Sequence, residues 1–297
     1  RTRRRMLPWV LTALAAGVLA VAIWLLVTPP AARRVVSPGD DAPDVTAERV
    51  LERSRSLVHT ADRQMAMASG APAPRQAESA RMARLAYRQA RELMMSWVRA
   101  HPDDLLVRPL LGEVHLRMGD VDRAMAAARN VLDRAPQSAG GLWLRGLIAR
   151  RQNDPNYARW FRRAAESPTA GGEIWIRYGL YLLLRGQSQR GEQYLREAYR
   201  AGRREPELLT ALARLEMQSG RSARAVELLR QAATKDGEAG PDLLGLLAEA
   251  QLNAGHLAAA AQTAQRAIRQ AGKPRRGELH MLLGAVRMAQ ERWDDAG

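Results

Sequence analysis

A turn residue recurs about every 34 residues from residue 105 onward. We call this recurring position the slot. It is occupied by Gly119, Asn153, Gly186, Gly220 and Gly255, which are spaced 34, 33, 34 and 35 residues apart. Five residues after each slot stands a small residue: Ala124, Ala158, Gly191, Ala225 or Ala260. A period of this length is typical of stacked helical hairpins. The chain is therefore expected to bury its apolar residues between successive hairpins, as repeat arrays do.

Apolar residues recur at helical spacing on both sides of each slot. In the unit around Gly220 they are Leu208, Leu209, Leu212 and Leu215 before the slot, and Val226, Leu228 and Leu229 after it. Glycine readily takes the left-handed conformation that ends a helix, and asparagine tolerates it. The small residue in the second helix then lets the two helices approach closely. The sequence thus predicts helix, tight turn, helix in every unit.

These positions resemble the tetratricopeptide repeat, with units starting near residues 105, 139, 172, 206, 241 and 277. The first unit supplies the expected residue types at Leu111, Gly112, His115, Gly119, Ala124, Ala128 and Pro136. The unit from residue 206 supplies Leu209, Leu212, Ala213, Gly220, Ala225, Leu229 and Ala232. The resemblance implies an all-α fold, a right-handed α-solenoid over residues 105–297, with the last unit truncated inside its second helix. Residues 44–104 are expected to form a divergent helical hairpin that caps this array.

Residues 7–27 form a run without any charged side chain. At about 1.5 Å per helical residue, such a run crosses the ~30 Å hydrocarbon layer of a bilayer. The sequence therefore predicts a single N-terminal transmembrane helix at 6–27, after a basic flank at 1–5 and before a Pro-rich linker at 28–43. A cleaved secretory signal peptide is the alternative, although its apolar run is usually about 7–15 residues.

The charges around this segment predict its orientation and its lipid partner. Four arginines precede the span, whereas two arginines and then acidic residues follow it. The positive-inside rule then places the N-terminus in the cytoplasm of a bacterium. The segment would cross the inner membrane once, with the repeats in the periplasm. Pairs of small residues four apart (Ala13 with Gly17, Ala16 with Ala20) offer a weak route to homo-oligomers through this helix.

The residue types needed for catalysis or metal binding are not grouped in this sequence. There is no cysteine, and none of the five histidines has another histidine three or four residues away. Neither a Gly-x-Ser-x-Gly elbow nor a phosphate-binding glycine loop with lysine occurs. We therefore expect no enzyme, no catalytic residue, no cofactor and no metal.

The resemblance implies that the first helices of the units line a concave groove that binds a protein. The predicted groove residues are Arg117, Trp143, Leu147, Arg150, Arg151, Ile176, Leu180, Leu183, Arg214 and Met217. Aromatic, Met and Arg side chains together are typical of interface cores. The net charge of +15 also suits an anionic partner. Nucleic acid is not expected, because aromatic residues make up only 5% and the arginines are spread over every unit.

The function predicted from these features is that of a membrane-anchored scaffold. It binds an unidentified protein partner in its groove, as part of a bacterial envelope assembly or of a polysaccharide or secretion machine. One alternative is a recruiting or regulatory arm of a larger enzyme or outer-membrane protein, whose functional domain lies beyond residue 297. The other alternative is a binder of an anionic polymer.

Overall fold

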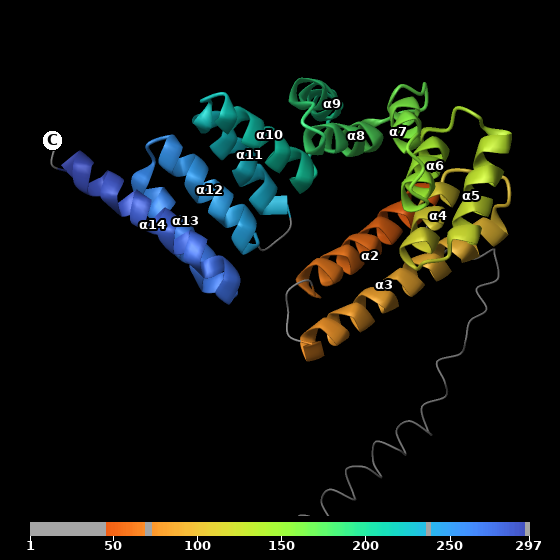
Figure 1. The fold of residues 1–297 in the computed structure, drawn as a ribbon, viewed down its shortest axis with the longest axis horizontal. Helices are drawn as coiled ribbons and strands as arrows, with labels where there is room; N and C mark the ends of the chain where they lie inside the picture. Colours follow the sequence, from red (N-terminus) through yellow and green to blue (C-terminus); the bar gives the residue numbers. More distant parts are fainter. Residues whose placement is uncertain (1–45, 69–72, 236–238, 295–297) are drawn as a thin grey trace, which may run out of the picture. The chain divides into compact units, whose positions relative to one another are not determined.

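The computed structural model describes residues 46–68, 73–235 and 239–294, and within these ranges every regular element is an α-helix (Figure 1). The helices are α2 Ala47–Ala68, α3 Ala73–Ala100, α4 Arg108–Arg117, α5 Val121–Arg134, α6 Ala139–Arg151, α7 Tyr157–Ala165, α8 Gly172–Leu184, α9 Ser188–Arg200, α10 Pro206–Gln218, α11 Ser222–Lys235, α12 Pro241–Asn253, α13 Leu257–Gln270 and α14 Lys273–Asp294. This confirms the predicted all-α array.

The basic flank at 1–5, the transmembrane helix at 6–27 and the linker at 28–43 all lie outside the described residues. Among the helices that the structure does describe, none combines the length and the apolar character needed to cross a bilayer.

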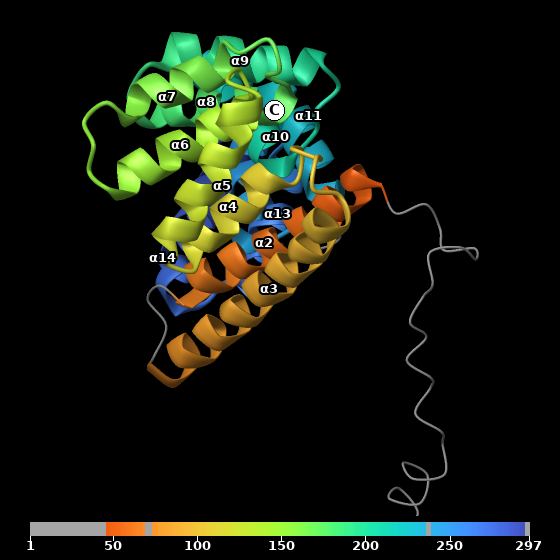
Figure 2. The same cartoon turned by 90° about the vertical axis from the view of Figure 1, so that its right-hand side faces the viewer.

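The helices pair as consecutive hairpins, α2 with α3, α4 with α5, and so on to α12 with α13. Each pair packs mainly against itself, and the second helix of one hairpin then contacts the first helix of the next (Figure 1, Figure 2). First helices also contact each other directly, as α4 does with α6 and α6 with α8. We call these first helices, α4, α6, α8, α10 and α12, the inner helices.

Every predicted slot residue has the left-handed backbone that the turn requires. The φ angle is +86° at Gly119, and positive values recur at Gly186, Gly220 and Gly255, with +58° at Asn153. The residue after each slot donates its backbone N–H to a carbonyl five residues earlier. This is the long hydrogen bond of the Schellman motif, which satisfies carbonyls left over at the end of the first helix. Asn153 is therefore a functional replacement for glycine in its unit.

The small residues predicted after each slot permit close helix packing, as Gly191 shows between α8 and α9. A Cβ atom placed on Gly191 would lie 2.9 Å from the carbonyl oxygen of Gly179. The backbones of the two helices are thus in contact, which leaves no room for the alanine that stands at the matching position in other units. The departure of Gly191 from the repeat pattern has a steric reason.

The apolar core is a row of clusters along the array. One cluster joins α2, α3 and α4, another joins the helices around Trp143 and Phe161, and the largest runs from α8 to α12. Each cluster draws residues from neighbouring hairpins. Stability in this chain therefore depends on contacts between successive units as well as on contacts within each hairpin.

The last unit differs from the sequence prediction. A turn was expected near residue 291 and a second helix after it, but α14 runs without a break from Lys273 to Asp294. The slot position of this unit holds Glu291, which has no preference for a left-handed turn. Without glycine or asparagine there, nothing local ends the helix.

Candidate partner-binding surface

A pocket lies between the inner helices α4 and α6. Its volume is about 540 Å³, and it is lined by Glu113, Leu116, Arg117, Leu147, Arg150, Arg151 and Asn153. The structure thus brings together four of the predicted groove residues: Arg117, Leu147, Arg150 and Arg151. Two leucines and three arginines give the pocket an apolar part and a cationic part.

Arg150 and Arg151 are two neighbouring cationic residues at the end of α6. Both side chains are exposed, and within the described residues neither has a carboxylate at ion-pair distance. The guanidinium carbon of Arg150 lies 6.0 Å from the ring centroid of Phe161, at the outer limit of a cation–π contact. Exposed guanidinium groups are able to donate charge-assisted hydrogen bonds to a carboxylate.

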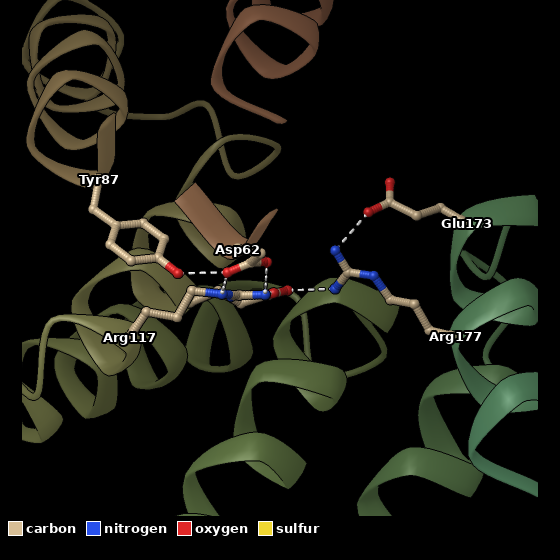
Figure 3. Close-up of polar contacts among 6 residues, drawn as sticks. Asp62, Tyr87, Arg117, Glu173 and Arg177 are labelled. Atoms are coloured by element: carbon tan, nitrogen blue, oxygen red, sulfur yellow. Dashed lines mark hydrogen bonds and ion pairs between the residues drawn. The ribbon is translucent and has the colours of Figure 1, made fainter. Parts of the chain in front are cut away.

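Arg117, on the opposite wall of this pocket, belongs to a row of ion pairs that runs from α2 through α4 to α8 (Figure 3). Its Nε and Nη2 donate to the two carboxylate oxygens of Asp62 on α2, at 3.1 and 3.3 Å. Its Nη1 donates to Glu113 Oε2 at 3.2 Å. The phenol of Tyr87 on α3 donates a further hydrogen bond to Asp62. Arg117 therefore has carboxylates on two sides.

The row of ion pairs continues through α8 and ends at a second residue of α2. Arg177 donates to Glu113 Oε1 at 2.5 Å and pairs with Glu173 Oε1 at 2.8 Å. The second oxygen of Glu173 pairs with Arg55 on α2. Three carboxylates and three guanidinium groups thus alternate in one row from Asp62 to Arg55, and helix α2, which carries both end residues, completes a ring. We call these six residues the charge ring.

Glu113 is the most buried member of the charge ring, with a side chain only 5% exposed. Burial alone would raise the pKa of Glu113, but the charges of Arg177 and Arg117 outweigh burial and hold that pKa below its usual value. Burial also acts on the two arginines, where it is outweighed by Glu113 and by Asp62 or Glu173, so that the pKa of each is raised. Glu113, Arg117 and Arg177 are therefore all charged near neutral pH.

Tyr87 is kept protonated by the same arrangement. Burial and the hydrogen bond to Asp62 raise the pKa of the Tyr87 phenol well above its usual range. The phenol is thus a permanent donor to Asp62. This donor orients the Asp62 carboxylate toward Arg117.

The remaining predicted groove residues are not part of the pocket. Trp143 is only 7% exposed, because its ring packs on Phe161 with centroids 4.4 Å apart, and the Arg177 guanidinium lies 5.9 Å from its centroid. Ile176 is buried, and the side chains of Leu180, Leu183 and Met217 pack against the cluster that runs from α8 to α12. Arg214 is exposed on α10.

Sequence reasoning missed most of the charge ring. The pairs Glu113 with Arg117 and Glu173 with Arg177 both have the i, i+4 spacing that brings side chains together on one helix face. That spacing was a usable signal for the inner helices. The part played by Asp62 and Arg55 had no such signal, since the α2–α3 hairpin does not follow the repeat. Within the described residues, no group of three or more His, Asp or Glu side chains is arranged to hold a metal ion.

A row of helical hairpins, each closed by the same left-handed turn, defines an α-helical repeat scaffold. A family model described as "Tetratricopeptide repeat" matches residues 110–171, 177–242, 210–273 and 246–297. The chain therefore belongs to the tetratricopeptide repeat family, as its pattern predicted, and it is a scaffold of the kind that mediates protein–protein interactions. None of the curated proteins matches the chain.

Several solved structures are similar to this chain. PilW, described as a widely conserved type IV pilus biogenesis factor, is 22% identical with a TM-score of 0.47, over 77% of this chain and 98% of that one. The pilF protein of Pseudomonas aeruginosa is 16% identical with a TM-score of 0.47, over 64% and 91%. YrrB, described as a TPR protein with an unusual peptide-binding site, is 15% identical with a TM-score of 0.46, over 67% and 100%. None of these likenesses bears on what this chain binds.

Proposed function

We propose that this protein is a membrane-anchored scaffold of a bacterial envelope assembly, and that the pocket between α4 and α6 binds an acidic segment of a protein partner. The binding proposal rests on the exposed side chains of Arg150 and Arg151, which line a partly apolar pocket. Neither arginine forms an ion pair with a carboxylate of the described residues. Family membership supports a protein as the ligand.

The chemistry of the pocket favours a carboxylate beside an apolar side chain. Arg150 and Arg151 offer charge-assisted hydrogen bonds, which are roughly twice as strong as neutral ones. Leu116 and Leu147 in the same pocket offer apolar area. A partner segment with Asp or Glu next to an aliphatic residue satisfies both parts. The proposal gives the chain a binding role and no catalytic one.

The anchor and the envelope location rest on the sequence. The uncharged run at 7–27 is long enough to cross a bilayer, and the arginines before it favour a cytoplasmic N-terminus. In this proposal the repeats lie on the periplasmic side of the inner membrane. The partner is then a component of an envelope assembly or of a polysaccharide or secretion machine.

Site-specific photocrosslinking in cells tests the binding surface. A photoreactive amino acid at Arg151 is expected to trap one discrete partner protein. The matched control carries the same amino acid at Arg129, an exposed residue on the second helix α5. The crosslink should weaken when Arg150 is replaced by Glu. The pocket is not the binding site if both positions crosslink equally well. The same conclusion follows if Arg150→Glu leaves the crosslinking yield unchanged.

A further inference from the structure

One stripe of helix α2 contacts three different inner helices. Arg55, His59 and Asp62 are spaced by four and three residues, so they share a face of the helix. Arg55 pairs with Glu173 of α8, His59 Nε2 lies 3.3 Å from Glu207 Oε1 of α10, and Asp62 pairs with Arg117 of α4. Helix α2 therefore extends its polar stripe along inner helices of three separate repeat units.

A neighbouring face of α2 is apolar and packs elsewhere. Val50, Leu51, Val58 and Ala61 are buried in the cluster shared with α3 and α4. Among the described helices, only α3 runs in extensive contact with α2. The contacts of α2 with α8 and α10 are thus made by the polar stripe and not by an apolar interface. Exposed ion pairs of this kind are weak and are screened by salt.

Arg117 connects this stripe to the partner-binding pocket. Its guanidinium lines the pocket while it donates to both Asp62 and Glu113. A carboxylate of a bound partner that reaches Arg117 competes with these two acceptors for the same guanidinium. Glu113 is buried and also held by Arg177, whereas the side chain of Asp62 is 43% exposed. Asp62 is the acceptor that can be exchanged.

We infer that α2 is an internal occupant of the inner surface, and that an acidic partner segment competes with Asp62 for Arg117 and releases the α2 stripe. The inference rests on the proposed function for the identity of the competitor. The statement that α2 occupies the inner surface rests only on the ion pairs of Arg55, His59 and Asp62 with the inner helices. In this arrangement the partner has to displace a segment of the chain itself, so binding is coupled to movement of the N-terminal hairpin.

The absence of cysteine from the sequence makes a distance measurement straightforward. Arg53→Cys on α2 and Arg230→Cys on α11 place spin labels at exposed positions away from the stripe and the pocket. Pulsed electron resonance of the full chain should give one narrow distance distribution. His59→Glu, which sets two carboxylates against each other at Glu207, should broaden it and shift it to longer distances. Adding Glu207→Lys should restore the narrow distribution.

A labelled octaglutamate peptide is the probe for competition. Its addition should shift the distribution as His59→Glu does, and Arg150→Glu with Arg151→Glu should abolish that shift. An unchanged distribution in His59→Glu and Asp62→Lys would overturn the inference, because α2 would then be held by its apolar face. Peptide binding without a change in distance would leave the proposed function standing and overturn the competition. If His59→Glu lengthens the distance but the peptide does not bind, the proposed acidic ligand is wrong. The attachment of α2 through its polar stripe is then still supported.

Discussion

The substitution Glu113→Gln tests how much the charge ring contributes to stability. Glu113 accepts from Arg117 at 3.2 Å and from Arg177 at 2.5 Å, and it is almost fully buried. Removing one member of a buried ion pair costs about 3–5 kcal/mol. The cost should be lower here, about 2 kcal/mol, because both arginines are partly exposed and keep Asp62 and Glu173 as partners.

The pH dependence of this effect has a definite sign. Because the pKa of Glu113 is lowered in the folded protein, its carboxylate stabilises the fold above the unfolded pKa, which is about 4.3. This stabilisation is lost as pH falls through the lower folded pKa. The difference in stability between wild type and Glu113→Gln should therefore be complete at neutral pH and should close as pH falls below about 4.

Thermal unfolding followed by circular dichroism measures the effect. For a domain of this size, about 2 kcal/mol corresponds to a fall in Tm of about 4 to 8 °C. Glu216→Gln is the matched control, since Glu216 is equally buried but forms its ion pairs with Arg196 and Arg221, neither of which lies on α2. Both variants should lose stability, and only Glu113→Gln should loosen α2. A Tm equal to wild type in Glu113→Gln would refute the reasoning.

Further substitutions test other parts of the structure. Trp143→Ala should lower the unfolding free energy by about 3–5 kcal/mol in urea titrations, because it removes a buried indole; an intact melting curve would show that Trp143 does not pack as described. Burial lowers the pKa of His115, so stability should fall as pH drops below about 6.5, and this loss should be absent in His115→Gln. Gly191→Ala should lower Tm by several degrees, because its Cβ would collide with the carbonyl of Gly179, and an unchanged Tm would contradict that contact. A phosphatase fused after Gly70 should be active if the repeats are exported, whereas an inactive phosphatase would reverse the proposed orientation.

The helical array could be predicted because its determinants are local. A glycine or asparagine every 34 residues dictates a left-handed turn, and the structure shows a positive φ at all five slots. Even the exception in the last unit follows from a local residue, since Glu291 gives no reason to end a helix. The resemblance to the repeat family implied which positions face inward, and the structure places four of them, Arg117, Leu147, Arg150 and Arg151, around one pocket.

The charge ring could not be predicted because it depends on how the N-terminal hairpin sits against the array. Asp62 and Arg117 are 55 residues apart, and nothing in the sequence around Asp62 identifies its partner. Trp143 shows a related limit: its repeat position predicts an inner face, but whether the ring is free or covered depends on Phe161 and Arg177 from other helices. Partners on distant helices decide which inner residues remain accessible.

The most direct test of the binding surface is the affinity of the full chain for the octaglutamate peptide, measured by fluorescence anisotropy. Arg150→Glu with Arg151→Glu should weaken binding at least tenfold, which corresponds to about 1.4 kcal/mol. The control, Arg159→Glu with Arg162→Glu, makes the same change of charge at exposed positions on α7 and should change affinity much less. Equal losses in the two variants would show that the peptide follows net charge, and they would contradict a binding site between α4 and α6.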